Sequence, residues 1–151
     1  IGMWVVDIEP NRTSEGAERF LFRDNTVGTY GLTDQYIVWL VSARAGAEGS
    51  VARDVSIIGN TITGNPSSGY DGDPLGLAVY VDGNLGPRSN WVIRDNTSSL
   101  NMSQNPHGAP IYIRDTDGVV VAGNRQPMGS GELARFPGST DVIYQDNDTS
   151  D

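Results

Sequence analysis

Carboxylate side chains placed close together on an extended run are the residues best suited to chemistry. Asp7 and Glu9 are two positions apart in the run 4–9, so on a strand both project to the same side, about 7 Å apart. Asp82 ends a later strand-like run and is a third candidate acid. Hydrolysis of a glycosidic bond needs two carboxyl groups roughly 5–9.5 Å apart. This spacing allows a polysaccharide hydrolase, although acids on exposed strands usually serve only solubility.

Aromatic residues recur at matching positions in three strand-like runs. Strict alternation turns Trp39, Tyr80 and Tyr112 outward. The apolar residues that it turns inward in these runs and in the run 4–9 are Val6, Ile8, Val38, Leu40, Val79, Val81, Ile111 and Ile113. Two outward rows then result on successive strands. The first row contains Asp7, Trp39, Tyr80 and Tyr112, and the second contains Glu9, Val41, Asp82, Arg114 and, from a degraded fifth run, Phe136.

Flat rings in a line, flanked by charged groups, suit a sugar chain, because rings pack on its C–H faces and charges bind its hydroxyls. This interpretation assigns a glycan site to Trp39, Tyr80, Tyr112, Asp82 and Arg114. An exposed apolar stripe can equally form a subunit interface or be covered by a loop. The sequence leaves these three interpretations open.

Signals for metals and for nucleophilic catalysis are weak. Asp71 and Asp73, or a second acidic group at the C-terminal end formed by Asp146, Asp148 and Asp151, could offer oxygen ligands to calcium. Asp-Gly pairs are, however, common in turns. His107 lies in a turn-like Asn-Pro-His-Gly sequence without a nearby nucleophile to activate. We therefore expect no cofactor, with calcium as the alternative.

Five short apolar runs end in Asp-Asn or Gly-Asn and repeat along the chain. Their asparagines are separated by 35, 36, 28 and 23 residues and are Asn25, Asn60, Asn96, Asn124 and Asn147. A second series of strand-like runs lies between them, at 4–9, 36–41, 77–82, 111–115 and, in degraded form, 133–136. Asparagine tolerates a left-handed bend, and stacked amides can hydrogen-bond as a ladder. We expect these asparagines to be structural.

The repeats predict an all-β coil of about five turns, with long loops where the spacing is wide. The run 55–63, Val-Ser-Ile-Ile-Gly-Asn-Thr-Ile-Thr, resembles the repeats of right-handed parallel β-helix proteins of the pectate-lyase-like group. The run 4–11 resembles a strand of bacteriophage tailspike-like proteins. The resemblance implies one β-helix domain over residues 1–151. A lyase of this group would use calcium and an arginine or lysine base, and Arg114 is the one arginine on the proposed face.

Composition narrows the class of function. Nineteen acids against ten bases, all arginine, give a net charge of −9, which disfavours nucleic acids and anionic membranes. The chain has no cysteine, so disulfides and thiolate chemistry are excluded. The first residue is Ile1, so we expect a fragment of a longer chain.

The interpretation we favour is a non-catalytic β-helix module of a surface or phage tail protein that binds cell-surface glycan. Such a protein would be extracellular or on the virion surface. A polysaccharide lyase or glycoside hydrolase fragment, with Asp7, Glu9 and Asp82 as acids, is one alternative. A structural or trimerisation stalk is the other. Open ends of a short stack expose strand edges, which favours a homo-oligomer, with a trimer as the expected form.

Overall fold

The chain folds into short strands throughout the part that the structure describes. This computed structural model describes residues 3–10, 12–13, 15–28, 38–43, 50–63, 76–82, 86–99, 109–129 and 131–150. Across these residues there are 14 strands and no helix, and hence no helix that could cross a membrane. Every recorded strand pair is parallel. The prediction of an all-β protein is confirmed.

The strands form three parallel sheets, which we name A, B and C. The strand order of sheet A is β1 (Met3–Asp7), β5 (Val38–Ala43), β8 (Val79–Val81), β11 (Ile111–Ile113) and β13 (Ala134–Arg135). Sheet B contains β14 (Thr140–Gln145), β12 (Asp117–Ala122), β9 (Arg88–Arg94), β6 (Val51–Ile58) and β2 (Gly16–Glu18), with β3 (Leu21–Arg23) also beside β6. Sheet C contains β10 (Thr97–Ser98), β7 (Thr61–Ile62) and β4 (Thr26–Val27).

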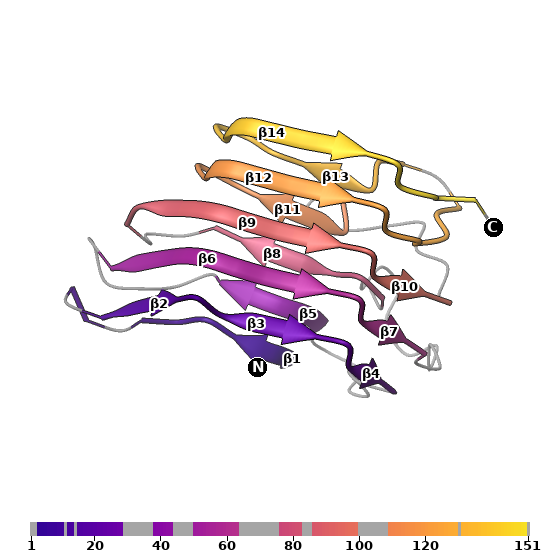
Figure 1. The fold of residues 1–151 in the computed structure, drawn as a ribbon, viewed down its shortest axis with the longest axis horizontal. Helices are drawn as coiled ribbons and strands as arrows, with labels where there is room; N and C mark the ends of the chain where they lie inside the picture. Colours follow the sequence, from indigo (N-terminus) through magenta and orange to yellow (C-terminus); the bar gives the residue numbers. More distant parts are fainter. Residues whose placement is uncertain are drawn as a thin grey trace.

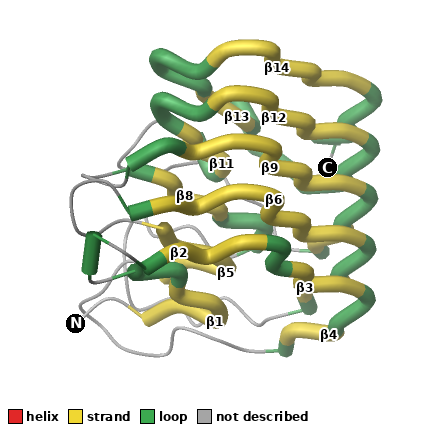
Figure 2. Tube along the Cα trace, turned by 60° about the vertical axis from the view of Figure 1, so that its left-hand side comes forward, coloured by secondary structure: helices red, strands yellow, loops and turns green. Residues whose placement is uncertain are grey.

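The chain passes through sheets A, B and C in turn, and each passage adds a strand beside the previous one (Figure 1). We call each passage a tier. Tier 1 contains β1 to β4, tier 2 contains β5 to β7, and tier 3 contains β8 to β10. In tiers 4 and 5 the place of the sheet C strand is taken by single bridges at Arg125 and Asp148. Figure 2 shows the tiers stacked from tier 1 to tier 5.

Apolar side chains from the sheets fill the space that they enclose. Val55, Trp91 and Val119 form one inward row along sheet B, and each of them is fully buried. The other large, fully buried apolar side chains among the described residues are Leu40, Ile57, Ile62, Leu77, Ile93, Ile111, Ile113 and Leu133. Burial of each such side chain contributes about 1.5–3 kcal/mol. One tier alone could not bury its apolar side chains on both sides, so the core depends on stacking.

The corner between sheets B and C is built from residues in the left-handed conformation. Its positions alternate between aspartate and glycine from tier to tier, with φ values of 53°, 66°, 56°, 64° and 54° at Asp24, Gly59, Asp95, Gly123 and Asp146. Asp24 and Asp95 each place a carboxylate oxygen in the space that a Cβ atom would need on the glycine of the next tier. The glycines therefore leave room for these carboxylates, which explains why both Asp-Asn and Gly-Asn occur in the repeat.

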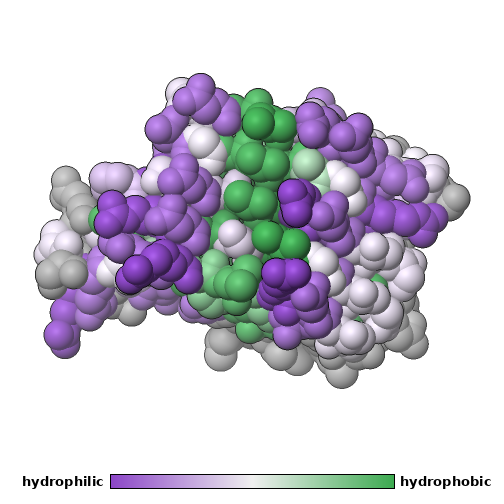
Figure 3. Space-filling model, in the orientation of Figure 1, coloured by the Kyte–Doolittle hydropathy of each residue, from purple (hydrophilic) through white to green (hydrophobic). Residues whose placement is uncertain are grey.

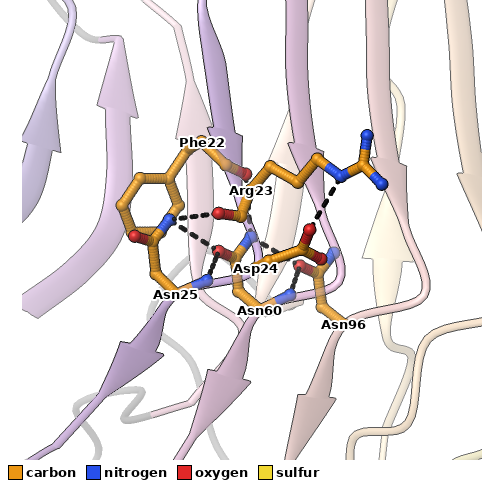
Figure 4. A network of polar contacts seen from close by, with 6 residues as sticks. All are labelled: Phe22, Arg23, Asp24, Asn25, Asn60 and Asn96. Atoms are coloured by element: carbon orange, nitrogen blue, oxygen red, sulfur yellow. Dashed lines mark hydrogen bonds and ion pairs between the residues drawn. The ribbon is translucent and has the colours of Figure 1, made fainter.

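The next residue at this corner is in every tier an asparagine of the predicted series, and the amides form a hydrogen-bonded ladder (Figure 4). Oδ1 of Asn96 accepts the backbone N–H and the side-chain amide of Asn60, at 3.0 and 2.9 Å. Nδ2 of Asn96 donates to Oδ1 of Asn124 and to the carbonyl of Ile57, both at 2.9 Å. These bonds satisfy the three buried amides in the middle of the ladder, which leaves them unsuited to ligand binding.

Candidate functional site

Two tyrosines stack on the outer face of sheet A, in neighbouring tiers. Tyr80 of β8 pairs in register with Tyr112 of β11, and their ring centroids lie 5.4 Å apart at an interplanar angle of 20°. The row continues to Ser42 on one side of Tyr80 and to Arg135 on the far side of Tyr112. Asp7 pairs with Ser42, so it belongs to this row as predicted.

The placement of Trp39 and Val41 was predicted wrongly. Trp39 pairs with Trp4, three positions away from the row of Tyr80, and Val41 is fully buried in the core. The reason is an irregularity in β5, where the N–H groups of Leu40 and Val41 both donate to the carbonyl of Ala78, at 2.8 and 3.1 Å. Both side chains are consequently buried, and the alternation shifts by one residue. Ser42 thereby takes the position expected for Trp39.

Charged groups flank the stacked tyrosines at the end of the same strands. Nη1 of Arg114 lies 3.4 Å from Oδ1 of Asp82, and the hydroxyl of Tyr80 donates to Oδ2 of Asp82 at 3.0 Å. Nε of Arg114 lies 3.3 Å from the carboxylate of Asp115. The two carboxylates, Asp82 foremost, raise the pKa of Arg114. Aromatic and ionic groups thus meet at the C-terminal ends of β8 and β11 in sheet A.

Phe136 does not join these charged groups. Because β13 pairs Ala134 with Ile111, the next inward position after Ala134 is Phe136, which packs half-buried against the core. The predicted outward position of Phe136 is therefore wrong.

The two tyrosines differ in their access to solvent. Tyr80 is only 7% exposed and packs with Ala78, Tyr112 and Met128 in a small cluster outside sheet A. Tyr112 is half-buried, and about half of the Arg114 side chain is exposed. The Tyr80 ring is covered, as the loop-packing interpretation expected. We call Tyr112, Asp82 and Arg114 the Tyr112 site, because these side chains reach the surface above Tyr80.

Arg88, the first residue of β9, is a buried cation that the sequence did not reveal. It is 6% exposed and pairs with the buried residue Ala52, while its Nε and Nη1 atoms have no hydrogen-bond partner among the described residues. Burial lowers the pKa of Arg88, an effect opposed first by Asp115 and then by Asp82. Strict alternation from Trp91 turns Arg88 outward, but the left-handed φ of Asn90, 57°, breaks that alternation. The signal that could have found this break is the recurrence of residues that tolerate a left-handed φ at this position, namely Asp54, Asn90, Gly118 and Asp141.

Replacing Arg88 by methionine is expected to raise the free energy of unfolding by about 1 kcal/mol, because two buried guanidinium nitrogens no longer need partners. Urea denaturation would measure the change. Arg94→Met, at an exposed position of the same strand, is the matched control and should stay within about 0.5 kcal/mol of the parent. A loss of stability in Arg88→Met would instead mean that its charge supports Asp82 and Asp115.

The three candidate acids lie at two separate places on the stack. Asp7 and Glu9 are exposed at the tier 1 edge, and Asp82 lies two tiers away, bonded to Tyr80 and Arg114. A general acid near neutral pH needs a carboxyl whose pKa is raised, usually by burial. Neither Asp7 nor Glu9 has that burial.

Candidate metal ligands are dispersed or already bonded. Asp71, Asp73, His107 and Asp151 lie outside the described residues, which contain no cluster of three or more side chains suited to a metal ion. Asp148 accepts the N–H and hydroxyl of Ser150, at 3.0 and 2.6 Å, and pairs with Arg125 at 3.2 Å. These hydrogen bonds lower the pKa of Asp148. The carboxylate of Asp148 therefore stabilises the turn that leads to Ser150.

Sequence reasoning missed a second surface, on the outer face of sheet B. Figure 3 shows a hydrophobic band crossing the strands of this sheet, with hydrophilic residues on both sides. In register along it lie Leu21, Ser56, Val92, Val120 and Ile143. Leu21 and Ile143 at its ends are 58% and 50% exposed. The sequence signal for this band is the lack of polar residues at alternate positions in runs such as 119–122. A continuous apolar run is typical of a strand that has apolar residues on both of its faces.

Comparison with protein-family models, with curated proteins and with solved structures finds no match to this chain. The class that the fold defines is therefore an all-β protein of stacked parallel strands. Its function has to be argued from its own surfaces.

Proposed function

We propose that the chain is a right-handed parallel β-helix module of the pectate-lyase-like group. The proposal is supported by the passage of the chain through three parallel sheets in constant order and by the asparagine ladder at one corner. Each tier then corresponds to one coil. The wide spacings between repeats become loops on the outside of the coil.

We further propose that this module binds cell-surface glycan without catalysis, at the Tyr112 site. The observation that carries the proposal is the half-buried Tyr112 ring, held by stacking on Tyr80 beside the Asp82–Arg114 pair. A ring fixed from behind can bind the C–H face of a sugar at small entropic cost. The adjacent carboxylate and guanidinium supply an acceptor and donors for hydroxyl groups.

The module would belong to a surface protein or a phage tail protein, at the cell exterior or on the virion. Its net charge of −9 disfavours nucleic acid as the partner and leaves a polysaccharide with few phosphate groups as the favoured one. The lack of burial at Asp7 and Glu9 supports a binding role over hydrolysis.

A structural stalk is the second candidate function, and the hydrophobic band on sheet B favours it. Contiguous apolar residues with a polar rim are typical of protein interfaces. In this alternative, copies of the chain, three in the expected form, associate through sheet B. The Tyr112 site on sheet A would then have no ligand.

The glycan proposal is tested by calorimetry against a panel of bacterial surface polysaccharides. Tyr112→Ala should weaken binding about tenfold or more, since it removes the stacked ring. Tyr144→Ala removes an exposed ring of sheet B in tier 5, away from the Tyr112 site, and is the matched control, expected to bind like the parent. Equal binding by all three proteins, or no binding, would contradict the proposal. So would release of reducing or unsaturated ends that is lost in Asp82→Asn.

A further inference from the structure

We propose that the turn from sheet A to sheet B encloses a binding site for a small, singly charged anion such as chloride, and that Arg88 and Ser50 hold the ion. The two residues belong to neighbouring tiers inside the stack: Arg88 is the first residue of β9 in tier 3, and Ser50 directly precedes β6 of tier 2. The site is distinct from the Tyr112 site, and the proposal does not depend on glycan binding.

The guanidinium of Arg88 is a buried charge without a direct acceptor. Arg88 is 6% exposed, and its Nε and Nη1 atoms lack hydrogen-bond partners among the described residues. A guanidinium has five N–H donors and no acceptor, so only acceptor atoms can satisfy it. Burial of a charge is costly unless the charge is paired and hydrogen-bonded. Arg88 therefore needs an acceptor, which a negatively charged one would supply best.

The nearby carboxylates do not meet this need. Asp115 and Asp82 attract Arg88, yet burial lowers its pKa in spite of both. Instead, their oxygen atoms lie 3.3 and 3.4 Å from the guanidinium of Arg114. The charge of Arg88 is consequently compensated only in part. Since Asp82 directly follows β8 and Asp115 lies between β11 and β12, their attraction also places the Arg88 guanidinium at the turn from sheet A to sheet B.

Ser50 contributes a second buried donor at the same turn. Its side chain is fully buried, and its Oγ atom has no hydrogen-bond partner in the described part of the chain. Ala52 pairs with Arg88 and is fully buried. Because Ser50 lies two positions before Ala52, its side chain projects to the same, inward side of the sheet. The two positions are about 7 Å apart along the strand, a distance that an extended arginine side chain spans.

A small anion fits these groups better than water or a sugar. The unpaired atoms are two guanidinium nitrogens and one hydroxyl, and all of them can donate a hydrogen bond. A water molecule carries no charge and adds two donors to a place that already has an excess of them. An anion accepts from several donors at once and compensates the guanidinium. The burial of Arg88 and Ser50 favours a monatomic ion over a sugar ring.

The dependence of stability on chloride tests the site. Thermal unfolding of the 151-residue chain is followed near neutral pH at constant ionic strength, while chloride replaces gluconate. Constant ionic strength keeps the screening of the net charge of −9 unchanged. At about ten times its dissociation constant, chloride should raise the ratio of folded to unfolded chain roughly tenfold. The melting temperature should then rise by about 3–6 °C.

Three variants assign the effect to the site. Arg88→Met should unfold at a higher temperature than the parent in gluconate, and it should lose this advantage as chloride is added, because only the parent binds the ion. Ser50→Ala should weaken chloride binding about tenfold, since it removes one donor to a charged acceptor. Arg94→Met removes an exposed guanidinium of the same strand and is the matched control, expected to respond to chloride like the parent.

Bromide, which scatters X-rays anomalously, gives the position of the ion. Crystals grown with bromide should show an anomalous signal within hydrogen-bonding distance of Nε or Nη1 of Arg88. A parent chain whose melting temperature does not change with chloride would overturn the proposal. Equal chloride shifts in the parent and in Arg88→Met would do the same, and so would an unchanged affinity in Ser50→Ala.

Discussion

Replacing Asn96 by alanine is expected to lower the free energy of unfolding by about 3–5 kcal/mol. The side chain makes four hydrogen bonds inside the stack, two accepted from Asn60 and two donated to Asn124 and Ile57. All four of its partner atoms lie at a corner where water does not replace them, since Asn60, Asn96 and Asn124 are at most 1% exposed. Urea denaturation followed by circular dichroism would measure the loss.

Asn147→Ala is the matched control, because this residue has the same role at the end of the ladder. It is half-buried, accepts two hydrogen bonds from Asn124 and donates one to the carbonyl of Val121. Water can reach its partners, so we expect a cost of about 1–2 kcal/mol. Equal costs at the two positions would show that the amides do not act as a buried ladder.

Replacing Gly123 by alanine is expected to cost about 2 kcal/mol. The backbone φ of Gly123 is 64°, a conformation that costs an alanine about 1 kcal/mol or more. The new Cβ atom would also displace the carboxylate of Asp95 in the preceding tier. Thermal or urea unfolding of the single variants and of the double variant with Asp95→Gly would separate the two causes.

The double variant should recover the part of the cost that comes from the carboxylate, about half of it, because the Asp95 side chain is then absent. Gly28→Ala is the control without strain: its φ is not left-handed, and no atom of the described part of the chain lies near its missing Cβ. It should change stability by less than about 0.5 kcal/mol. Strict additivity in the Gly123 and Asp95 cycle would show that the carboxylate does not occupy the space of the missing Cβ.

The Tyr112 site and the hydrophobic band are well separated on the molecule. The Tyr112 site lies on sheet A in tiers 3 and 4, and the hydrophobic band crosses sheet B. Glycan binding and association through sheet B are therefore expected to respond to different substitutions. Tyr112→Ala reports on the first and Val120→Lys, in the hydrophobic band, on the second.

The sequence by itself determined the all-β class, the five-fold recurrence and the place of the asparagine corner in each tier. These features depend on local chemistry: asparagine and aspartate accept left-handed bends, and the apolar runs before them have strand propensity. Because every tier repeats the same local pattern, the positions of Asn60, Asn96 and Asn124 in successive tiers could be predicted before any contact was known.

Only the tertiary structure decided which side chains share a row and which of them meet solvent. The irregularity at Leu40 and Val41 depends on hydrogen bonds to the carbonyl of Ala78, the residue before β8, which lies 38 and 37 residues later in the chain, so no pattern within β5 predicts it. The inward position of Arg88 follows from the bend at Asn90, and the covering of Tyr80 follows from packing with Met128, far along the sequence. Register and burial are properties of contacts between tiers, which is why alternation within single strands misplaced Trp39, Val41 and Phe136.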